Sequence, residues 1–283
     1  MNDRFRLTLL RLLPTHAISR LAGRFAGSRL SKWLIPIYAR HFQIDLQQAE
    51  KPLEAYQTLT EFFTRKLKSE CRPIAEGERV LVSPVDGVVS QSGPIRNGTL
   101  LQAKGVSYSL EQLLGDRQKA ESYEGGVFLT IYLSPRDYHR IHTCLKGTVT
   151  GYSYIPGTLF PVNPFGVRNI PGLFAKNERL TTYIATPFGE YAIVKVGATI
   201  VGSVQVVYDE KLTTNVRHGR MTHATVAGPT LEKGAELGLF RFGSTVICLF
   251  QPGMVQLDDL QEGQFVQMGQ RIGEIAPVQA ADR

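Results

Sequence analysis

The sequence has few cysteines and no long apolar run. Three cysteines, Cys71, Cys144 and Cys248, occur among 283 residues. Their odd number and wide spacing argue against a disulfide scaffold and against a paired-cysteine zinc site. No stretch approaches the roughly 18 consecutive apolar residues that a membrane-spanning helix requires. The opening apolar run is cut by Arg11 and no small-residue cleavage site follows, so we expect no signal peptide and a reducing compartment.

The composition is that of a packed globular protein. Hydrophobic residues make up 43% of the chain and charged residues 20%, which excludes a disordered chain. The length allows one large domain, or one domain with an appendage. The chain shows neither a fixed-period repeat nor a low-complexity tract.

Positive charge is concentrated at the N-terminus. Residues 1–42 contain eight basic side chains and one acidic one, a difference that equals the net charge of +7 of the whole chain. The rest of the chain is therefore neutral. Such an asymmetry indicates a local electrostatic partner and not a generally basic protein.

Apolar residues in this basic segment follow a helical period. The two stripes are Phe5, Leu9, Leu12 and Leu13, then Leu30, Trp33, Leu34 and Ile37. Pro14 and Pro36 divide the pattern into two or three short helices. Such helices suit the surface of an anionic bilayer. The alternatives are helices that pack on their own domain with arginines facing water, and a nucleic-acid arm. The arm is disfavoured because no repeated aromatic platform is present.

The remaining chain is rich in β-strand patterns. A helix is expected over about 58–68, where Thr58 and Glu61 have capping-box spacing. Short apolar runs between glycine- or proline-bearing turns then predict strands at Val127–Leu133, Thr148–Tyr154, Tyr191–Val196, Ile200–Tyr208 and Val246–Phe250. We expect an α+β fold that is mainly antiparallel β, with a sandwich or barrel-like body behind short amphipathic helices.

Two segments resemble the swapped hairpins of lipoyl and biotin carriers. They are SPVDGVV at 83–89 and GQFVQMGQRIGEI at 264–276. Neither has the lysine-bearing tip that receives the cofactor in such carriers. The similarity therefore predicts strand geometry and not a carrier function.

Ser244 lies in a Gly-Ser-Thr triplet directly before the strand at Val246–Phe250. Glycine before a serine leaves the preceding carbonyl sterically open. An ordinary turn entering a strand is the plain alternative. The GxSxG elbow of hydrolases is excluded, because position 242 is Phe and position 246 is Val.

A second candidate site is SPRDYHRIHT at 134–143, where His139 and His142 lie among Arg136, Asp137 and Arg140. It concentrates general bases and anion-binding groups. Surface or capping histidines are the alternative. A metal site that recruits His218, His223 or Cys144 is disfavoured, because no HExxH or paired-cysteine spacing occurs.

Asp86 follows Pro84 and precedes Gly87, a setting typical of a turn aspartate. It could instead orient one of the loop histidines. Asp86, a histidine and Ser244 would then form an Asp–His–Ser arrangement.

Together and in this order, the motifs resemble the bacterial phosphatidylserine decarboxylases, which are self-cleaving enzymes. The resemblance covers most of residues 55–250 and is carried by FFTRKLKSECRPI (62–74), SPVDGVVS (83–90), YLSPRDYHRIHTCLKGTV (132–149), LFPVNP (159–164), LFAKNERL (173–180), VGATIVGS (196–203) and KGAELGLFRFGST (233–245). The family's Leu-Gly-Ser-Thr motif reads Phe242-Gly243-Ser244-Thr245 here, which leaves the reacting Gly–Ser pair intact.

The resemblance implies specific roles for these residues. Cleavage between Gly243 and Ser244 would convert Ser244 into a covalent pyruvoyl group, without pyridoxal phosphate or a metal. Asp86, His142 and Ser244 would form the triad for cleavage, and His139 would serve decarboxylation. Candidate substrate-binding groups are His139, Arg136 and Arg140.

The resemblance also implies partners and an organisation. Residues 1–45 would be membrane-associating helices and 46–283 the catalytic domain, cleaved into a β chain (1–243) and an α chain (244–283). The enzyme would convert phosphatidylserine to phosphatidylethanolamine and CO2 through a Schiff base, as a homodimer of cleaved protomers on the cytoplasmic side of the cell membrane, without nucleic acid. An Asp–His–Ser hydrolase and a non-catalytic membrane-bound β module are the alternatives.

Overall fold

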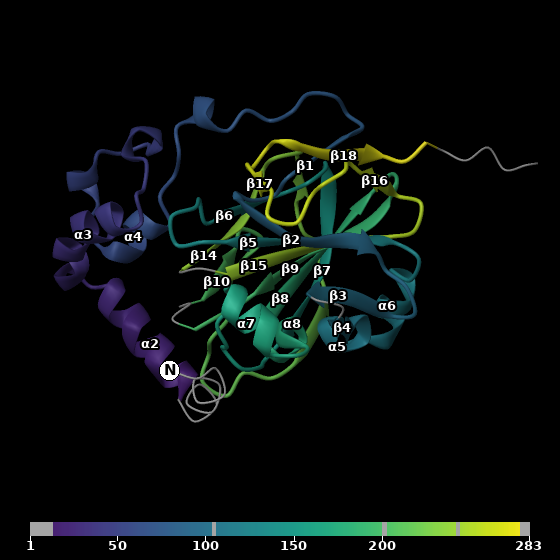
Figure 1. Cartoon of the computed structure of the whole chain (residues 1–283), viewed down its shortest axis with the longest axis horizontal. Helices are drawn as coiled ribbons and strands as arrows, with labels where there is room; N and C mark the ends of the chain where they lie inside the picture. Colours follow the sequence, from purple (N-terminus) through teal and green to yellow (C-terminus); the bar gives the residue numbers. More distant parts are fainter. Residues whose placement is uncertain (1–13, 104–105, 200–202, 242–243, 278–283) are drawn as a thin grey trace, which may run out of the picture.

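The protein consists of antiparallel β-sheets with a group of short helices on one side (Figure 1). A computed structural model describes residues 14–103, 106–199, 203–241 and 244–277, without the side chains of Ala103 and Ser244. The expected α+β class, mainly antiparallel β, is confirmed. In the described part of the chain no helix is long and apolar enough to cross a membrane.

The largest sheet is open, so the body is not a closed barrel. Its strands lie in the order β12-β7-β8-β9-β15-β5-β2-β17, and β13 also pairs with β7. Their bounds are β12 (Thr222–Thr225), β7 (Gly147–Ile155), β8 (Arg179–Thr186), β9 (Gly189–Val196), β15 (Ser244–Phe250), β5 (Val127–Leu133), β2 (Gly87–Pro94), β17 (Phe265–Val266) and β13 (Thr230–Leu231).

Three smaller sheets complete the body. Their orders are β11-β10-β14-β6, β1-β18-β16 and β3-β4. Their bounds are β11 (Asp209–Thr213), β10 (Val204–Val206), β14 (Glu236–Phe240), β6 (Arg140–His142), β1 (Val80–Val82), β18 (Arg271–Ile275), β16 (Val255–Leu257), β3 (Thr99–Ala103) and β4 (Val106–Ser109).

Strand β15 lies in the middle of the largest sheet and is buried on both faces. Val246, Cys248 and Phe250 join one apolar cluster, and Ile247 and Leu249 join another. Successive side chains of a strand point to opposite faces, so a strand with two covered faces needs a continuous apolar run. The continuous apolar sequence VICLF is therefore what a central strand with two buried faces requires.

One group of short helices precedes the sheets, and a second group includes helices that pack on a face of the largest sheet. The first group is α2 (Thr15–Ala26), the 3-10 helix η1 (Arg29–Trp33), α3 (Leu34–His41), η2 (Leu46–Gln48), η3 (Leu53–Ala55), α4 (Leu59–Phe63) and η4 (Ser69–Cys71). The second is α5 (Leu110–Leu114), α6 (Arg117–Ser122), α7 (Pro164–Asn169) and α8 (Leu173–Lys176). Pro14 precedes α2 and Pro36 lies in the first turn of α3, where a missing N–H costs little.

The predicted helix over 58–68 is shorter than expected. Its start is as predicted, because Thr58 Oγ1 accepts from Glu61 N at 3.1 Å. The helix ends at Phe63, and the following residues run beside 48–50: Glu50 N donates to Lys66 O, and Lys68 N to Gln48 O. Tertiary pairing thus overrides the local helical preference.

Most strand predictions agree with the structure. The runs at Val127–Leu133, Thr148–Tyr154, Tyr191–Val196 and Val246–Phe250 lie within β5, β7, β9 and β15. The run at 200–208 is shorter, since β10 covers only Val204–Val206 and residues 200–202 lie outside the described chain. The two carrier-like segments pair with each other, with Phe265 opposite Val88 and Val266 opposite Gly87.

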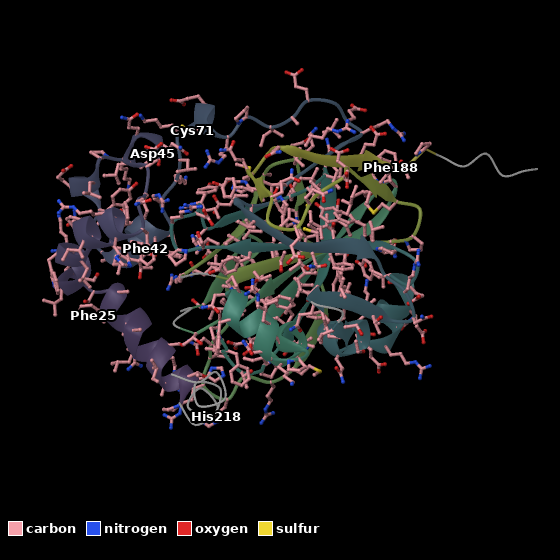
Figure 2. All side chains as sticks on the ribbon, in the orientation of Figure 1. Phe25, Phe42, Asp45, Cys71, Phe188 and His218 are labelled. Atoms are coloured by element: carbon pink, nitrogen blue, oxygen red, sulfur yellow. The ribbon has the colours of Figure 1, made fainter. Side chains whose placement is uncertain are left out.

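The N-terminal helices expose a set of large apolar side chains. Leu21, Leu30 and Trp33 are 71%, 74% and 63% exposed, and Ile18, Phe25 and Ile37 are also exposed. Phe25 lies on the outer side of α2 (Figure 2). The opposite side of these helices joins α4 in a buried cluster of Ala26, Ile35, Ala39, Ile44, Tyr56, Leu59 and Phe62. We call the six exposed side chains of Ile18, Leu21, Phe25, Leu30, Trp33 and Ile37 the apolar patch.

Candidate active site

Two connections meet at one end of β15. Ser244 is paired with Leu133, the last residue of β5. Phe240, the last residue of β14, donates its N–H to the carbonyl of His139 at 3.0 Å. The described ends of the β14–β15 connection therefore lie beside the ends of the segment 134–139. Phe242 and Gly243 lie outside the described residues, as does the Ser244 side chain, so the predicted bond to be cleaved is placed only by its flanks.

His139 is fully buried and has one ring nitrogen without a partner. Its Nδ1 donates to the carbonyl of Asp137 at 2.8 Å, which leaves a lone pair on Nε2. Nε2 has no hydrogen-bond partner in the described part of the chain. The ring packs against Phe63, with centroids 4.0 Å apart. Burial and, to a lesser extent, the nearby Arg65 charge lower the pKa of His139 to about 3 despite its hydrogen bond to Asp137, so the imidazole is neutral at neutral pH.

His142 is bonded through both ring nitrogens. Nδ1 donates to the carbonyl of Gly234 at 2.8 Å, so Nε2 accepts from the hydroxyl of Tyr138 at 3.2 Å. Burial lowers the pKa of His142 below its usual value, so this ring is neutral as well. The lone pair that a general base needs thus faces the Tyr138 hydroxyl.

The carboxylate of Asp86 is buried and binds Arg72. It is 1% exposed. Arg72 Nε donates to Oδ1 at 2.8 Å, Arg72 Nη2 contacts Oδ2 at 2.5 Å, and Met268 N donates to Oδ1 at 2.8 Å. The predicted hydrogen bond from Asp86 to a loop histidine is absent between the described residues, because the polar atoms of both Asp86 and His142 have other partners. Asp86 acts on His142 only through its charge, which raises that pKa.

We expect the Arg72→Leu variant to lose about 3–5 kcal/mol of unfolding free energy, because it leaves the Asp86 carboxylate buried without its cation. Urea unfolding at neutral pH would measure the loss. Arg271→Leu is the matched control, since Arg271 pairs with Asp258 and Glu274 on the surface and its removal should change little. Equal losses for the two variants would show that the Arg72–Asp86 pair contributes no more than a surface pair.

The two arginines predicted to bind substrate differ in their availability. The Arg136 side chain is exposed, 3.7 Å from Asp137 Oδ1. Arg140 is already neutralised, because its Nη1 contacts both oxygens of Glu236 at 2.7 and 2.8 Å, and its Nε donates to Thr64 O. A phosphodiester at Arg140 would have to compete with Glu236.

A cavity of about 350 Å³ adjoins these groups. It lies between the N-terminal helices and the body, and most of its lining is apolar. The lining residues are Tyr38, Phe42, Leu59, Phe63, Tyr132, Leu133, Pro135, Pro161, Val162, Asn163, Ala198 and Thr199. It thus includes Phe63, which packs on His139, and Leu133, which pairs with Ser244. A mostly apolar cavity close to the neutral ring of His139 suits a reaction in which a charged group loses its charge.

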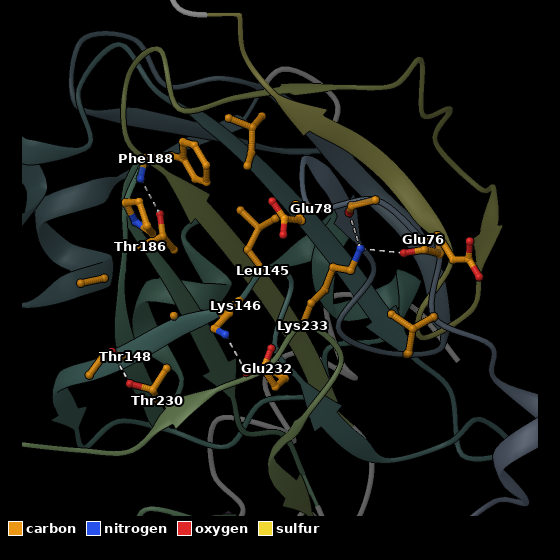
Figure 3. A pocket seen from close by; sticks show the side chains of 17 residues that line it. Glu76, Glu78, Leu145, Lys146, Thr148, Thr186, Phe188, Thr230, Glu232 and Lys233 are labelled. Carbon is orange, nitrogen blue, oxygen red and sulfur yellow. Dashed lines mark hydrogen bonds and ion pairs between the residues drawn. The ribbon is translucent and has the colours of Figure 1, made fainter.

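A larger cavity of about 830 Å³ lies at the other end of the sheet (Figure 3). Phe188 and Thr186 from the β8–β9 turn line it, whereas Ser244 belongs to the opposite end of this antiparallel array. The amino groups within it are occupied: Lys233 binds the carbonyls of Ala75 and Gly77, and Lys146 pairs with Glu232. We therefore place the reacting site at the smaller cavity.

The residues that a metal site would have to recruit do not lie together in the structure. Cys144 lies 4.0 Å from Cys248, sulfur to sulfur, and both thiols are free and buried. His223 binds Ser153 at 2.8 Å, and His218 is exposed. Among the described residues, no group of three histidine, cysteine or acidic side chains is placed to hold a metal ion.

Three site residues were missed in the sequence. Arg72 binds Asp86, and the Tyr138 hydroxyl binds His142. Arg65 donates to the carbonyl of Arg136 at 3.0 Å. Arg65 is 5% exposed and lies over the ring of Phe62 at 5.4 Å. All three belong to the motifs quoted above, yet nothing in their spacing indicates which acid, ring or carbonyl each one meets.

Comparison with known proteins gives a consistent result. A family model described as phosphatidylserine decarboxylase matches residues 59–274. A phosphatidylserine decarboxylase proenzyme from Brevibacillus brevis is 50% identical over 268 residues, which covers 93% of this chain and 95% of that protein. Proenzymes of the same name from Myxococcus xanthus and Shewanella frigidimarina are 47% and 42% identical, and the alignments cover 97% and 95% of this chain and 100% and 97% of those proteins.

Proposed function

Because the chain belongs to the phosphatidylserine decarboxylase family and is thus a carboxy-lyase, we propose that it converts phosphatidylserine to phosphatidylethanolamine and CO2 with a pyruvoyl group made from its own Ser244. One observation carries the proposal. The strand that begins at Ser244 starts beside the buried segment that holds His139 and His142. The expected product assigns the protein to phospholipid biosynthesis.

The pyruvoyl group would arise by cleavage of the chain. The Ser244 oxygen attacks the carbonyl carbon of Gly243, and an ester replaces the amide as the C–N bond breaks. The hydroxyl proton passes to a base and then to the freed amine. Loss of the Cα proton of residue 244 expels the Gly243 carboxylate and leaves dehydroalanine. Water then replaces nitrogen, ammonia departs and a ketone remains.

His142 is the proposed base for this cleavage. Its Nε2 carries the lone pair, and the Tyr138 hydroxyl lies on that nitrogen. A proton from Ser244 would therefore either displace this hydroxyl or pass through it. Asp86 contributes negative charge, which favours the protonated ring. Its bond to Arg72 fixes the carboxylate in place.

His139 is the proposed proton carrier in decarboxylation. The ketone supplies the electron sink as CO2 departs. The lone pair on Nε2 makes His139 a proton acceptor first, and the carboxylate of the bound substrate would raise the low pKa of the ring so that it can take a proton from the ammonium group. The same proton can then be returned to the substrate α-carbon. The neutral ring is required for this order of events.

The apolar patch supports contact with a bilayer. A lipid substrate remains in its membrane, so the cavity must lie at the interface. Leu21, Leu30 and Trp33 are exposed on consecutive helices, among basic residues such as Arg24 and Arg29. This combination is typical of helices that lie in the headgroup region. We propose peripheral attachment on the cytoplasmic side and a homodimer of cleaved protomers.

We expect Leu30→Glu combined with Trp33→Glu to weaken binding to anionic vesicles by at least about tenfold, because two apolar side chains that would insert into the bilayer become charges that anionic headgroups repel. Vesicle co-sedimentation would measure binding, and gel electrophoresis would show that self-cleavage is retained. Phe188→Glu, at the far end of the molecule (Figure 2), is the control. Charge reversal at Arg4, Arg6 and Arg11, outside the described residues, should act in the same direction. Unchanged sedimentation would reject the membrane role.

The intact mass of the purified protein under denaturing conditions tests the proposed function. We expect a large chain that ends at Gly243 and a small chain of residues 244–283 that lacks an amino terminus and carries a borohydride-sensitive carbonyl. A serine hydrolase would stay whole and react with a fluorophosphonate at Ser244. A non-catalytic β module would stay whole, take no label and form no product.

A further inference from the structure

A cationic groove lies between α2 and the β10–β11 region, close to the reacting end of β15. Its volume is about 340 Å³. The lining residues are Ser19, Arg20, Gly23, Arg24, Gly27, Thr60, Ser203, Thr213, Thr214, Asn215, Val216 and Arg241. Three of them are arginines and none is acidic. The other polar groups in the lining are hydroxyls and one amide.

None of these three arginines forms an ion pair with another described residue. The side chains of Arg24 and Arg241 are both exposed. Arg20 is partly balanced, because its charge lowers the pKa of Glu178, a carboxyl whose pKa burial raises. Glu178 lines a neighbouring cavity and not this groove. The available charge therefore belongs to Arg24 and Arg241.

The sequence of α2 explains why the groove is open. The side of the helix that faces the body carries small residues, Ser19, Gly23 and Gly27, at intervals of four. These residues lie on one face and leave space between helix and sheet. Arg20 and Arg24 are also four apart, and both line that space. An anion there would meet guanidinium groups that form bidentate, charge-assisted hydrogen bonds.

The groove is near the proposed reacting group. The N–H of Arg241 donates to the carbonyl of Ser203 at 2.8 Å, which fixes the start of the connection to Ser244. Three residues span at most about 10 Å. In a serine phospholipid, the phosphodiester and the amine belong to the same headgroup. A phosphodiester in the groove would thus place the amine within reach of residue 244.

The groove also lies at a suitable depth for a lipid headgroup. The outer side of α2 carries Ile18, Leu21 and Phe25, all exposed. A helix lying in a bilayer surface buries such a face by roughly 5–10 Å, at the boundary between headgroups and acyl chains. The side that bears Arg24 then faces the headgroups. Arg140, by contrast, is held by Glu236.

We propose that this groove binds the phosphodiester of the phospholipid headgroup, with Arg24 and Arg241 as its ligands. The proposal rests on the proposed function, since it assigns a position to the substrate of that reaction. It predicts that both arginines act on substrate binding and not on self-cleavage.

The experiment uses glycerophosphoserine, a soluble headgroup without acyl chains, as substrate of the full-length protein. We expect Arg24→Gln and Arg241→Gln each to raise KM about ten- to a hundredfold, the usual effect of losing a charge-assisted hydrogen bond, with kcat changed much less. Self-cleavage should be complete in both. Arg24→Lys should recover part of the loss, because it keeps the charge but not the bidentate geometry. Arg117→Gln, in α6 outside the groove, is the control. Arg29→Gln, in η1, shows how far general attraction by the membrane contributes when vesicles are used.

Unchanged KM in both glutamine variants would overturn the proposal. So would a loss seen only with vesicles and equally in Arg29→Gln, because that pattern assigns the arginines to general attraction by the membrane. If the wild-type protein neither cleaves nor turns over, the proposed function itself fails. Calorimetric titration with glycerophosphoserine then still tests the groove: binding that Arg24→Gln abolishes would support it, and no binding would reject it.

Discussion

The Ser244→Ala variant is expected to remain a single chain of 31.4 kDa with no detectable decarboxylase activity. Alanine lacks the hydroxyl that attacks the Gly243 carbonyl, so neither the cleavage nor the ketone can form. Because the electron sink would be covalent, added pyridoxal phosphate or metal should not restore activity. The expected effect is the largest in the molecule, since the proposed mechanism needs this one hydroxyl both for chain cleavage and for the formation of the carbonyl group that decarboxylation uses.

Denaturing mass spectrometry and a CO2-release assay would check this result. Ser92→Ala is the matched control, because Ser92 also lies in the largest sheet opposite a residue of β5, Leu129. It should mature and turn over normally. A cleaved and active Ser244→Ala protein would contradict the proposed origin of the carbonyl group.

The second large effect is expected at His139. Phenylalanine at this position keeps a ring against Phe63 but removes Nε2. We expect His139→Phe to cleave itself normally and to lose about 10²- to 10⁴-fold in turnover, the range for loss of a general acid or base. His142→Phe should show the opposite pattern, with defective cleavage. Normal turnover of cleaved His139→Phe would remove this histidine from the mechanism.

The same residue predicts a pH effect on stability. The pKa of His139 is about 3 in the folded protein and near 6.5 in an unfolded chain. Between these values the unfolded chain binds the extra proton, so stability rises with pH across this window and is lost as the pH falls from 6.5 toward 3. His139→Phe should weaken this acid dependence. Urea unfolding at pH 4.5 and pH 7.5 would measure it, and an unchanged slope would contradict the buried neutral state.

The sheet strands were largely predictable because they depend on local pattern. The continuous apolar run of β15 and the turns around β5 and β9 are visible without tertiary knowledge. The helix at α4 was predicted correctly at its start, where the cap is a contact within four residues. Its end was wrong because pairing of 66–68 with 48–50 is a long-range contact that no local pattern encodes.

The residues of the candidate site could be named from the sequence, but the hydrogen bonds and ion pairs between them could not. The segment 134–143 and Ser244 were identified separately, and the pairing of Leu133 with Ser244 brings them together. The partner that the structure shows for Asp86, Arg72, was not predicted. A buried carboxylate needs a cation or several donors, and Arg72 meets that need better than a neutral imidazole does. Choosing between them requires knowing which groups are buried together.

The position of β15 has a consequence for the matured protein. This strand is hydrogen-bonded to β9 on one edge and to β5 on the other along its length. Cleavage just before Ser244 would break the polypeptide but keep the hydrogen bonds that pair β15 with β5 and with β9. The two pieces should then melt in one cooperative transition and separate no faster than the whole fold opens. The small chain would be a permanent structural member rather than an exchangeable subunit.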